Sequence, residues 1–214
     1  MNSRVRLAGF VAISLAATYY SATRSWHGRW LLTRSPAAVR DALHESHQLG
    51  QNYIFPGCGV GREDAGRAEC FIRGLTQSDP QVVRRFIDDR DPEVRVAAAL
   101  ALGWSRDQAA APAIYQMMVS DPNPRVRADA AGALARMNTA SIQSDLDRLS
   151  ASKDALTRVC AYFAMSKPPS KEAVDWLVNL RLGLFDIETD ADYQATRLAS
   201  HLVWKIRHPE NQSD

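Results

Sequence analysis

Two histidines three positions apart are the first candidates for chemistry in this chain. His44 and His47 lie in the segment His-Glu-Ser-His, and residues i and i+3 of a helix share a face, so their imidazoles could begin a metal site. No third ligand stands at a matching spacing, and the His-Glu-x-x-His pattern of zinc proteases is absent. We therefore expect both histidines on a solvated helix face, with no metal and no cofactor bound.

A glycine-rich stretch and two nearby cysteines are the next candidates. Residues 51–61 place three glycines after Pro56, but neither a strand before them nor a Lys-Ser/Thr pair after them supports a phosphate-binding loop, so we expect a plain turn. Cys58 and Cys70 lie twelve residues apart. They could form a disulfide in an oxidising compartment, or remain two thiols. The third cysteine, Cys160, falls within a later helix and is expected to be a small structural residue.

No catalytic constellation emerges from the rest of the chain. The Gly-x-Ser-x-Gly elbow of serine hydrolases and paired Cys-x-x-Cys motifs are both absent. Asp88, Asp89 and Asp91 form an acidic corner, but arginines are interleaved with them, which indicates a salt-bridged turn. The sequence therefore predicts a protein that is not an enzyme.

The N-terminus has the composition of a membrane segment. An uncharged run of 17 residues, Leu7–Thr23, follows Arg4 and Arg6, and this length is at the lower limit for a spanning helix. Aromatic residues near its end, including Trp26 and Trp30, are typical of a membrane interface. We expect an uncleaved signal anchor, with a cleaved signal peptide or a buried soluble helix as alternatives. An N-in orientation would place the remainder outside the cytoplasm, on the periplasmic side.

The remainder of the chain contains an internal repeat. The segment Asp89–Gly103 recurs as Asp121–Ala135, 32 residues later, and a weaker third copy lies within Asp154–Met165. A period near 30 residues is typical of a solenoid, in which each unit covers its neighbour's apolar face.

Caps and apolar spacing predict helices and turns without strands. The expected helices cover 37–48, 62–74, 80–88, 92–104, 108–119, 124–137, 140–149, 154–165, 171–182 and 191–207. The chain accordingly divides into an anchor or signal (1–25), an N-terminal helical region (26–75), the repeat region (76–207) and a polar tail (208–214).

The repeated motif resembles a known family. Asp-Pro-x-Val-Arg-x-x-Ala-Ala-x-Ala-Leu, present as Asp91–Leu102 and with Asn at the first position as Asn123–Leu134, is similar to HEAT repeats. It is most similar to the short variety found in phycobilisome-lyase-type HEAT proteins. A fourth, more distant copy covers Asp192–Trp204. The resemblance implies an all-α fold, a right-handed α-solenoid of four to five helical hairpins preceded by the N-terminal hydrophobic helix.

The resemblance also implies roles for individual residues. In HEAT proteins the motif arginine pairs with loop acids, which predicts a structural ladder whose purpose is to stabilise the stack. Its members are Asp91, Arg95, Asn123, Arg127, Asp154 and Arg158. The second helix of each unit generally lines the concave surface, which makes several residues candidates for contact with a partner protein. These candidates are Trp104, Arg125, Asp129 and Arg136. Trp104 and Trp204 could instead lie mainly in the core.

Charge narrows the function classes. The whole chain carries a net charge of +2, and residues 76–214 hold 17 Lys and Arg against 19 Asp and Glu, so we expect no nucleic-acid partner. The leading hypothesis is a membrane-anchored, non-enzymatic scaffold within a larger complex, binding one or more proteins. A chromophore-lyase-like protein and, more remotely, a nucleic-acid-binding HEAT protein are the alternatives.

Overall fold

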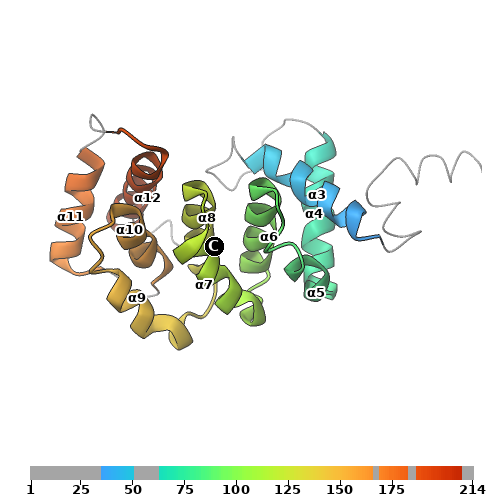
Figure 1. Ribbon diagram of the computed structural model, residues 1–214, viewed down its shortest axis with the longest axis horizontal. Helices are drawn as coiled ribbons and strands as arrows, with labels where there is room; N and C mark the ends of the chain where they lie inside the picture. Colours follow the sequence, from blue (N-terminus) through green and yellow to red (C-terminus); the bar gives the residue numbers. More distant parts are fainter. Residues whose placement is uncertain (1–34, 51–62, 166–168, 183–186, 209–214) are drawn as a thin grey trace, which may run out of the picture. The chain divides into compact units, whose positions relative to one another are not determined.

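The computed structural model describes residues 35–50, 63–165, 169–182 and 187–208 (Figure 1). These residues form α-helices joined by turns and short 3-10 segments, with no strand among them, which confirms the all-α prediction. The chain divides into two compact units, residues 1–82 and 83–214, and each is described by itself.

Two helices that pack against each other form the described part of the first unit. They are α3 (Pro36–Gly50) and α4 (Glu63–Ser78). In α3 the buried residues include Val39 and Leu43, four positions apart and both fully inaccessible, so one helical stripe supplies the contact. The predicted end of the second helix at Gly74 was wrong, because α4 continues for one more turn.

A short helix, α5 (Pro80–Arg84), spans the point where the sequence passes from the first unit to the second. It is shorter than the predicted helix 80–88, and residues 85–88 form turns. Arg84 forms a bidentate ion pair with Asp107, with N–O distances of 2.5 and 2.6 Å. This pair joins the end of α5 to the turn that precedes the next hairpin.

The second unit continues with longer helices whose bounds lie close to the predicted ones. They are α6 (Pro92–Trp104), α7 (Ala111–Ser120), α8 (Pro124–Leu134), α9 (Gln143–Leu149), α10 (Ala155–Ala164), α11 (Lys171–Leu182) and α12 (Asp190–Arg207). The 3-10 segments η1 (Gln108–Ala110) and η2 (Ala140–Ile142) precede α7 and α9. The predicted helix 124–137 ends three residues early, at Leu134.

Local capping explains where the repeated helices begin. The Asp91 carboxylate accepts a hydrogen bond from the Glu93 amide at 3.0 Å, and the Asn123 side chain accepts one from the Arg125 amide at 2.9 Å. A proline follows each of these caps at the first helical position, where a missing N–H costs nothing. Asp154 caps α10 in the same way, through the Thr157 amide at 2.7 Å.

The helices of the second unit stack as hairpins. Helices α7 and α8 pack together, as do α9 and α10, and α11 and α12, while α8 also contacts α6, α10 and α12. The core between them is aliphatic and fully buried, with Val94, Leu102, Val126, Leu134 and Leu156 at most 1% exposed. This is the α-solenoid arrangement that the repeats predict, and its right-handedness stays a prediction.

Small residues let α6 and α8 approach closely. A Cβ atom on Gly103 would lie 2.8 Å from the Ala133 Cα atom and 2.9 Å from its carbonyl oxygen, which is inside normal contact distance. Just beyond Gly103, α6 ends in a Schellman motif: the Asp107 amide bonds the Leu102 carbonyl, and Arg106 adopts a φ of 55°. The tight contact and this turn fix where Trp104 leaves the helix.

Several predictions concern residues outside the described ranges. The anchor segment, the glycine-rich turn with Cys58, and residues 209–214 of the tail all fall there. Cys70 belongs to α4, but its side chain is not described. Among the helices that are described, none is long and apolar enough to cross a membrane.

Candidate interaction surface

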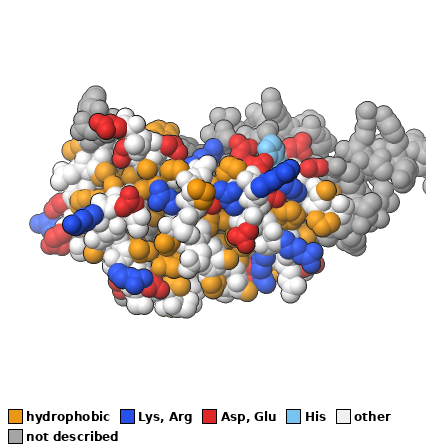
Figure 2. Space-filling view, in the orientation of Figure 1, with side chains coloured by type: hydrophobic (Ala, Val, Ile, Leu, Met, Phe, Trp, Pro, Cys, Tyr) orange, Lys and Arg blue, Asp and Glu red, His pale blue; other side chains and the backbone are white. Residues whose placement is uncertain are grey.

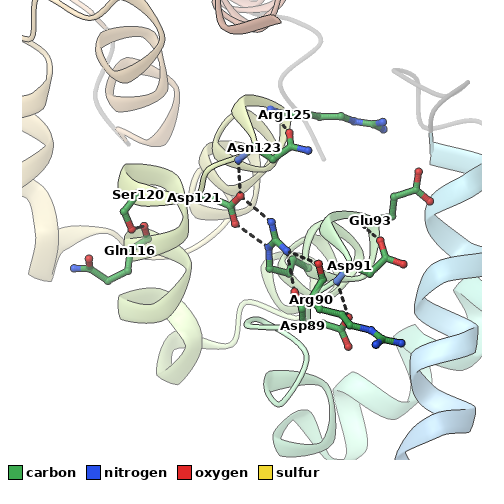
Figure 3. A network of polar contacts seen from close by, with 10 residues as sticks. Asp89, Arg90, Asp91, Glu93, Gln116, Ser120, Asp121, Asn123 and Arg125 are labelled. Atoms are coloured by element: carbon green, nitrogen blue, oxygen red, sulfur yellow. Dashed lines mark hydrogen bonds and ion pairs between the residues drawn. The ribbon is translucent and has the colours of Figure 1, made fainter.

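The arginine ladder exists as one well-formed rung. Nε and Nη2 of Arg95 donate to the two carboxylate oxygens of Asp121 at 2.8 and 2.9 Å, and Nη1 donates to the Asp89 carbonyl at 2.8 Å. The side chains of Arg95 and Asp121 are 13% and 6% exposed. Figure 3 shows the Asp121 carboxylate between the start of α8 and the turn before α6. This rung ties two consecutive repeats together.

The pairing predicted for the ladder was wrong. Arg95 pairs with Asp121 of the next repeat, and Asp91, Asn123 and Asp154 act as helix caps instead. The acid that serves the arginine stands two residues before the cap, where Asp121 also accepts the Asn123 amide at 2.9 Å. The aspartate at this position both shapes the turn and receives the arginine.

The third copy of the repeat lacks that acid. Its equivalent residue is Ser152, whose hydroxyl accepts the Asp154 amide at 3.1 Å and so keeps the turn. A serine offers no carboxylate to Arg127, and the buried Nε of Arg127 has no hydrogen-bond partner in the described part of the chain. The guanidinium of Arg158 instead lies over the Trp176 ring, 4.1 Å from its centroid. The predicted ladder therefore does not continue as a row of ion pairs.

The predicted contact residue Asp129 is engaged within the protein. Its carboxylate lies 3.0 Å from an Arg197 nitrogen of α12 and 3.6 Å from an Arg125 nitrogen of its own helix, and its side chain is 15% exposed. Helix α12 thus covers part of α8, and the acid of α8 is neutralised by two internal arginines.

Trp104 and Arg136 form an exposed stacked pair. Trp104 is 49% exposed, so its placement mainly in the core was wrong. The Arg136 guanidinium lies 4.2 Å from the centre of the indole ring and donates to the Gly132 carbonyl at 2.8 Å. Burial lowers the pKa of Arg136 from its ordinary value. The pair presents a rigid apolar ring and a partly desolvated cation on the surface.

A second aromatic group lies at the end of α12. The His201 ring is 5.4 Å from that of Phe163 in α10 and 6.5 Å from that of Trp204, and Trp204 stacks on His208 at 5.0 Å. Burial, then the charges of Lys205, Arg136 and Arg197, lower the pKa of His201 to about 4. Trp204 is 41% exposed, which contradicts a core position. The spacing of His201, Trp204 and His208 at i, i+3 and i+7 could have indicated one helical stripe.

The described residues offer no second kind of site. They contain no group of three or more His, Cys, Asp or Glu side chains arranged to hold a metal ion. Cys160 is fully buried, as predicted, and burial raises the pKa of its thiol to about 12. Such a thiol is protonated and unreactive at neutral pH.

Comparison with known proteins identifies the repeats. Residues 71–135 match the family model of HEAT repeats, which confirms the resemblance carried by the motif. No curated protein and no solved structure shows significant similarity to the chain.

Proposed function

Residues 71–135 of this chain are HEAT repeats, and we propose that the repeat region is a non-enzymatic scaffold that binds another protein. HEAT repeats generally mediate protein interactions, and the stacked hairpins provide a rigid surface on which side chains keep fixed positions. Large aromatic side chains stand on that surface, notably Trp104 and Trp204.

The observation that carries the proposal is the Trp104–Arg136 pair. Tryptophan and arginine are the residues most enriched among the side chains that dominate binding energy at protein interfaces. Here the ring is half exposed and held in place by a guanidinium 4.2 Å away. Because the ring is already ordered, binding a partner costs little side-chain entropy.

The test is co-purification with a matched pair of variants. Tagged full-length protein is isolated from detergent-solubilised cells and the co-purifying chains are identified by mass spectrometry. We expect a stoichiometric partner with the wild type and with Tyr193→Ala, which removes another exposed aromatic ring, 52% accessible at the start of α12. We expect it to be lost with Trp104→Ala. The absence of a stoichiometric partner from the wild type would contradict the proposal.

We also propose that the N-terminal segment anchors the scaffold in a membrane, with the repeats on the periplasmic side. The support is the uncharged run Leu7–Thr23 that follows Arg4 and Arg6. In that compartment Cys58 and Cys70 could form a disulfide.

Alkaline extraction of membranes tests the anchor. The full chain should stay in the membrane pellet, and a chain lacking residues 1–25 should be released. A full-length product found in the soluble fraction, with a mature N-terminus after residue 16 or 22, would contradict the anchor. Protease digestion of intact spheroplasts tests the side of the membrane: the repeats should be cleaved, and their protection would contradict the periplasmic placement.

A further inference from the structure

Rings and cations form a continuous series across α6, α8, α10 and α12. Trp104 at the end of α6 stacks under Arg136, which bonds the Gly132 carbonyl of α8. A Cβ atom on Gly132 would lie 4.0 Å from the Phe163 ring of α10. From Phe163 the contacts continue to His201 and the Lys205 ammonium, 5.4 and 5.7 Å away. The members lie near the carboxyl-terminal ends of their helices.

Acidic side chains are missing from this part of the four helices. Residues 94–106, 130–144, 155–164 and 193–208 contain no Asp or Glu. The acid of α8 nearest in sequence, Asp129, is taken up by two arginines. The cations Arg136, Lys205 and Arg207 therefore stand on helix segments that carry no carboxylate of their own.

Burial and mutual repulsion act on these cations. Burial lowers the pKa of Arg136, and burial and the charge of Arg136 lower the pKa of Lys205. For His201 the effects of Lys205, Arg136 and Arg197 add to that of burial in the same direction. A carboxylate placed among these groups would relieve the repulsion.

We propose that Trp104, Arg136, His201, Trp204 and Lys205 form a docking surface for an acidic, aromatic- or leucine-containing segment of a partner protein. We call it the aromatic–cation surface. Carboxylates of the segment would meet Arg136 and Lys205, and its apolar side chains would lie against the exposed rings of Trp104 and Trp204. This inference rests on the proposed scaffold function and names its site and the chemistry of its partner.

Charge favours a peptide over a polynucleotide. Residues 76–214 carry 17 basic and 19 acidic residues, so no broad positive field supports the many phosphate contacts that drive nucleic-acid binding. The space-filling view agrees: over α6–α12 basic side chains stand singly among hydrophobic and acidic ones (Figure 2). A local pair of cations between exposed rings fits a short segment with a few carboxylates.

Fluorescence anisotropy with defined peptides tests the surface. The protein is the full-length chain in mild detergent, and the probe is a short fluorescein-labelled peptide with glutamates around two tryptophans. Its counterpart has lysine in place of each glutamate. We expect saturable binding of the acidic probe that weakens with salt, and at least about tenfold weaker binding of the lysine probe.

Variants locate the binding. Arg136→Glu and Lys205→Glu together should weaken binding of the acidic probe by about tenfold or more, and Trp204→Ala by about fivefold. Arg148→Glu is the matched charge reversal on α9, where the side chain is 74% exposed, and should change binding less than twofold. Circular dichroism of each variant confirms that the comparison is between folded proteins.

Three results would overturn the inference: equal binding of the two probes, wild-type affinity in the double variant, or tighter binding of a labelled oligothymidine than of the acidic peptide. Co-purification with the same double variant separates this failure from that of the scaffold. If the natural partner still co-purifies, the scaffold stands and the aromatic–cation surface does not. If the wild type yields no partner, the scaffold itself is contradicted.

Discussion

Replacing Gly103 with alanine should destabilise the second unit, although alanine is the better helix former. The added Cβ atom would lie 2.8 Å from the Ala133 Cα atom, 2.9 Å from its carbonyl oxygen and 3.0 Å from its Cβ atom. Two of these three atoms belong to the backbone, so no side-chain rotation can make room. Helices α6 and α8 would have to separate by several tenths of an ångström along a contact lined by buried alanines.

Two opposing terms set the size of the effect. Overpacking in a well-packed core costs about 1–3 kcal/mol, and here the obstacle is backbone, which favours the upper half of that range. Alanine gains at most about 1 kcal/mol over glycine in a helix interior, and less near the helix end where Gly103 lies. We expect a net loss of about 1–2.5 kcal/mol in the free energy of unfolding. For a unit of this size that lowers Tm by roughly 4–10 °C.

Thermal and urea unfolding followed by circular dichroism measure this loss, and Gly132→Ala is the matched control. Gly132 lies within α8, and its Cβ atom would be 4.0 Å from the Phe163 ring, an ordinary contact. That variant should be unchanged or more stable by up to about 1 kcal/mol. A Gly103→Ala protein as stable as Gly132→Ala would refute the close approach of α6 and α8.

Two further substitutions test the polar part of the account. Asp121→Ala removes the carboxylate that holds Arg95, and because both side chains are largely buried it should cost about 2–4 kcal/mol in chemical denaturation; Arg148→Ala, which breaks a pair with 74% and 43% exposed side chains, should cost less than about 0.5 kcal/mol, and equal losses would contradict the difference in burial. His201 has a pKa lowered to about 4, so between pH 7 and pH 5 the unfolded chain takes up a proton that the folded chain does not, and stability falls with acid. His201→Gln should remove about 1 kcal/mol of that fall, allowing for the partial exposure of the ring; an unchanged pH dependence of the urea midpoint would show that the ring titrates normally.

The sequence predicted the helices well where caps and apolar spacing agree. For α6 the cap Asp91, the first-turn Pro92 and a regular apolar stripe give both ends correctly. The ends of α5 and α8 were placed too late because apolar residues beyond them, such as Ile87 and Met137, are buried from turns as well as from helices. Hydrophobic periodicity indicates which residues are buried and does not by itself mark where a helix stops.

Contacts between repeats were harder to predict. The ladder was paired within each motif, whereas Arg95 reaches the acid two residues before the next cap. The recurrence of aspartate at 89 and 121, and its replacement by Ser152, is the signal that would have indicated this. The packing of α12 on α8 has no comparable signal. An apolar stripe predicts that a helix face is covered, and the tertiary arrangement decides which neighbour covers it.

Site-specific photocrosslinking in cells tests the central claim most directly. A photoreactive phenylalanine analogue is placed at Trp104, at Trp204 and, as a control, at the exposed Arg148 of α9. If the aromatic–cation surface of a HEAT-repeat scaffold binds a partner, positions 104 and 204 should crosslink to the same protein and position 148 should not. Different proteins at the two positions, or no crosslink at either, would contradict the account.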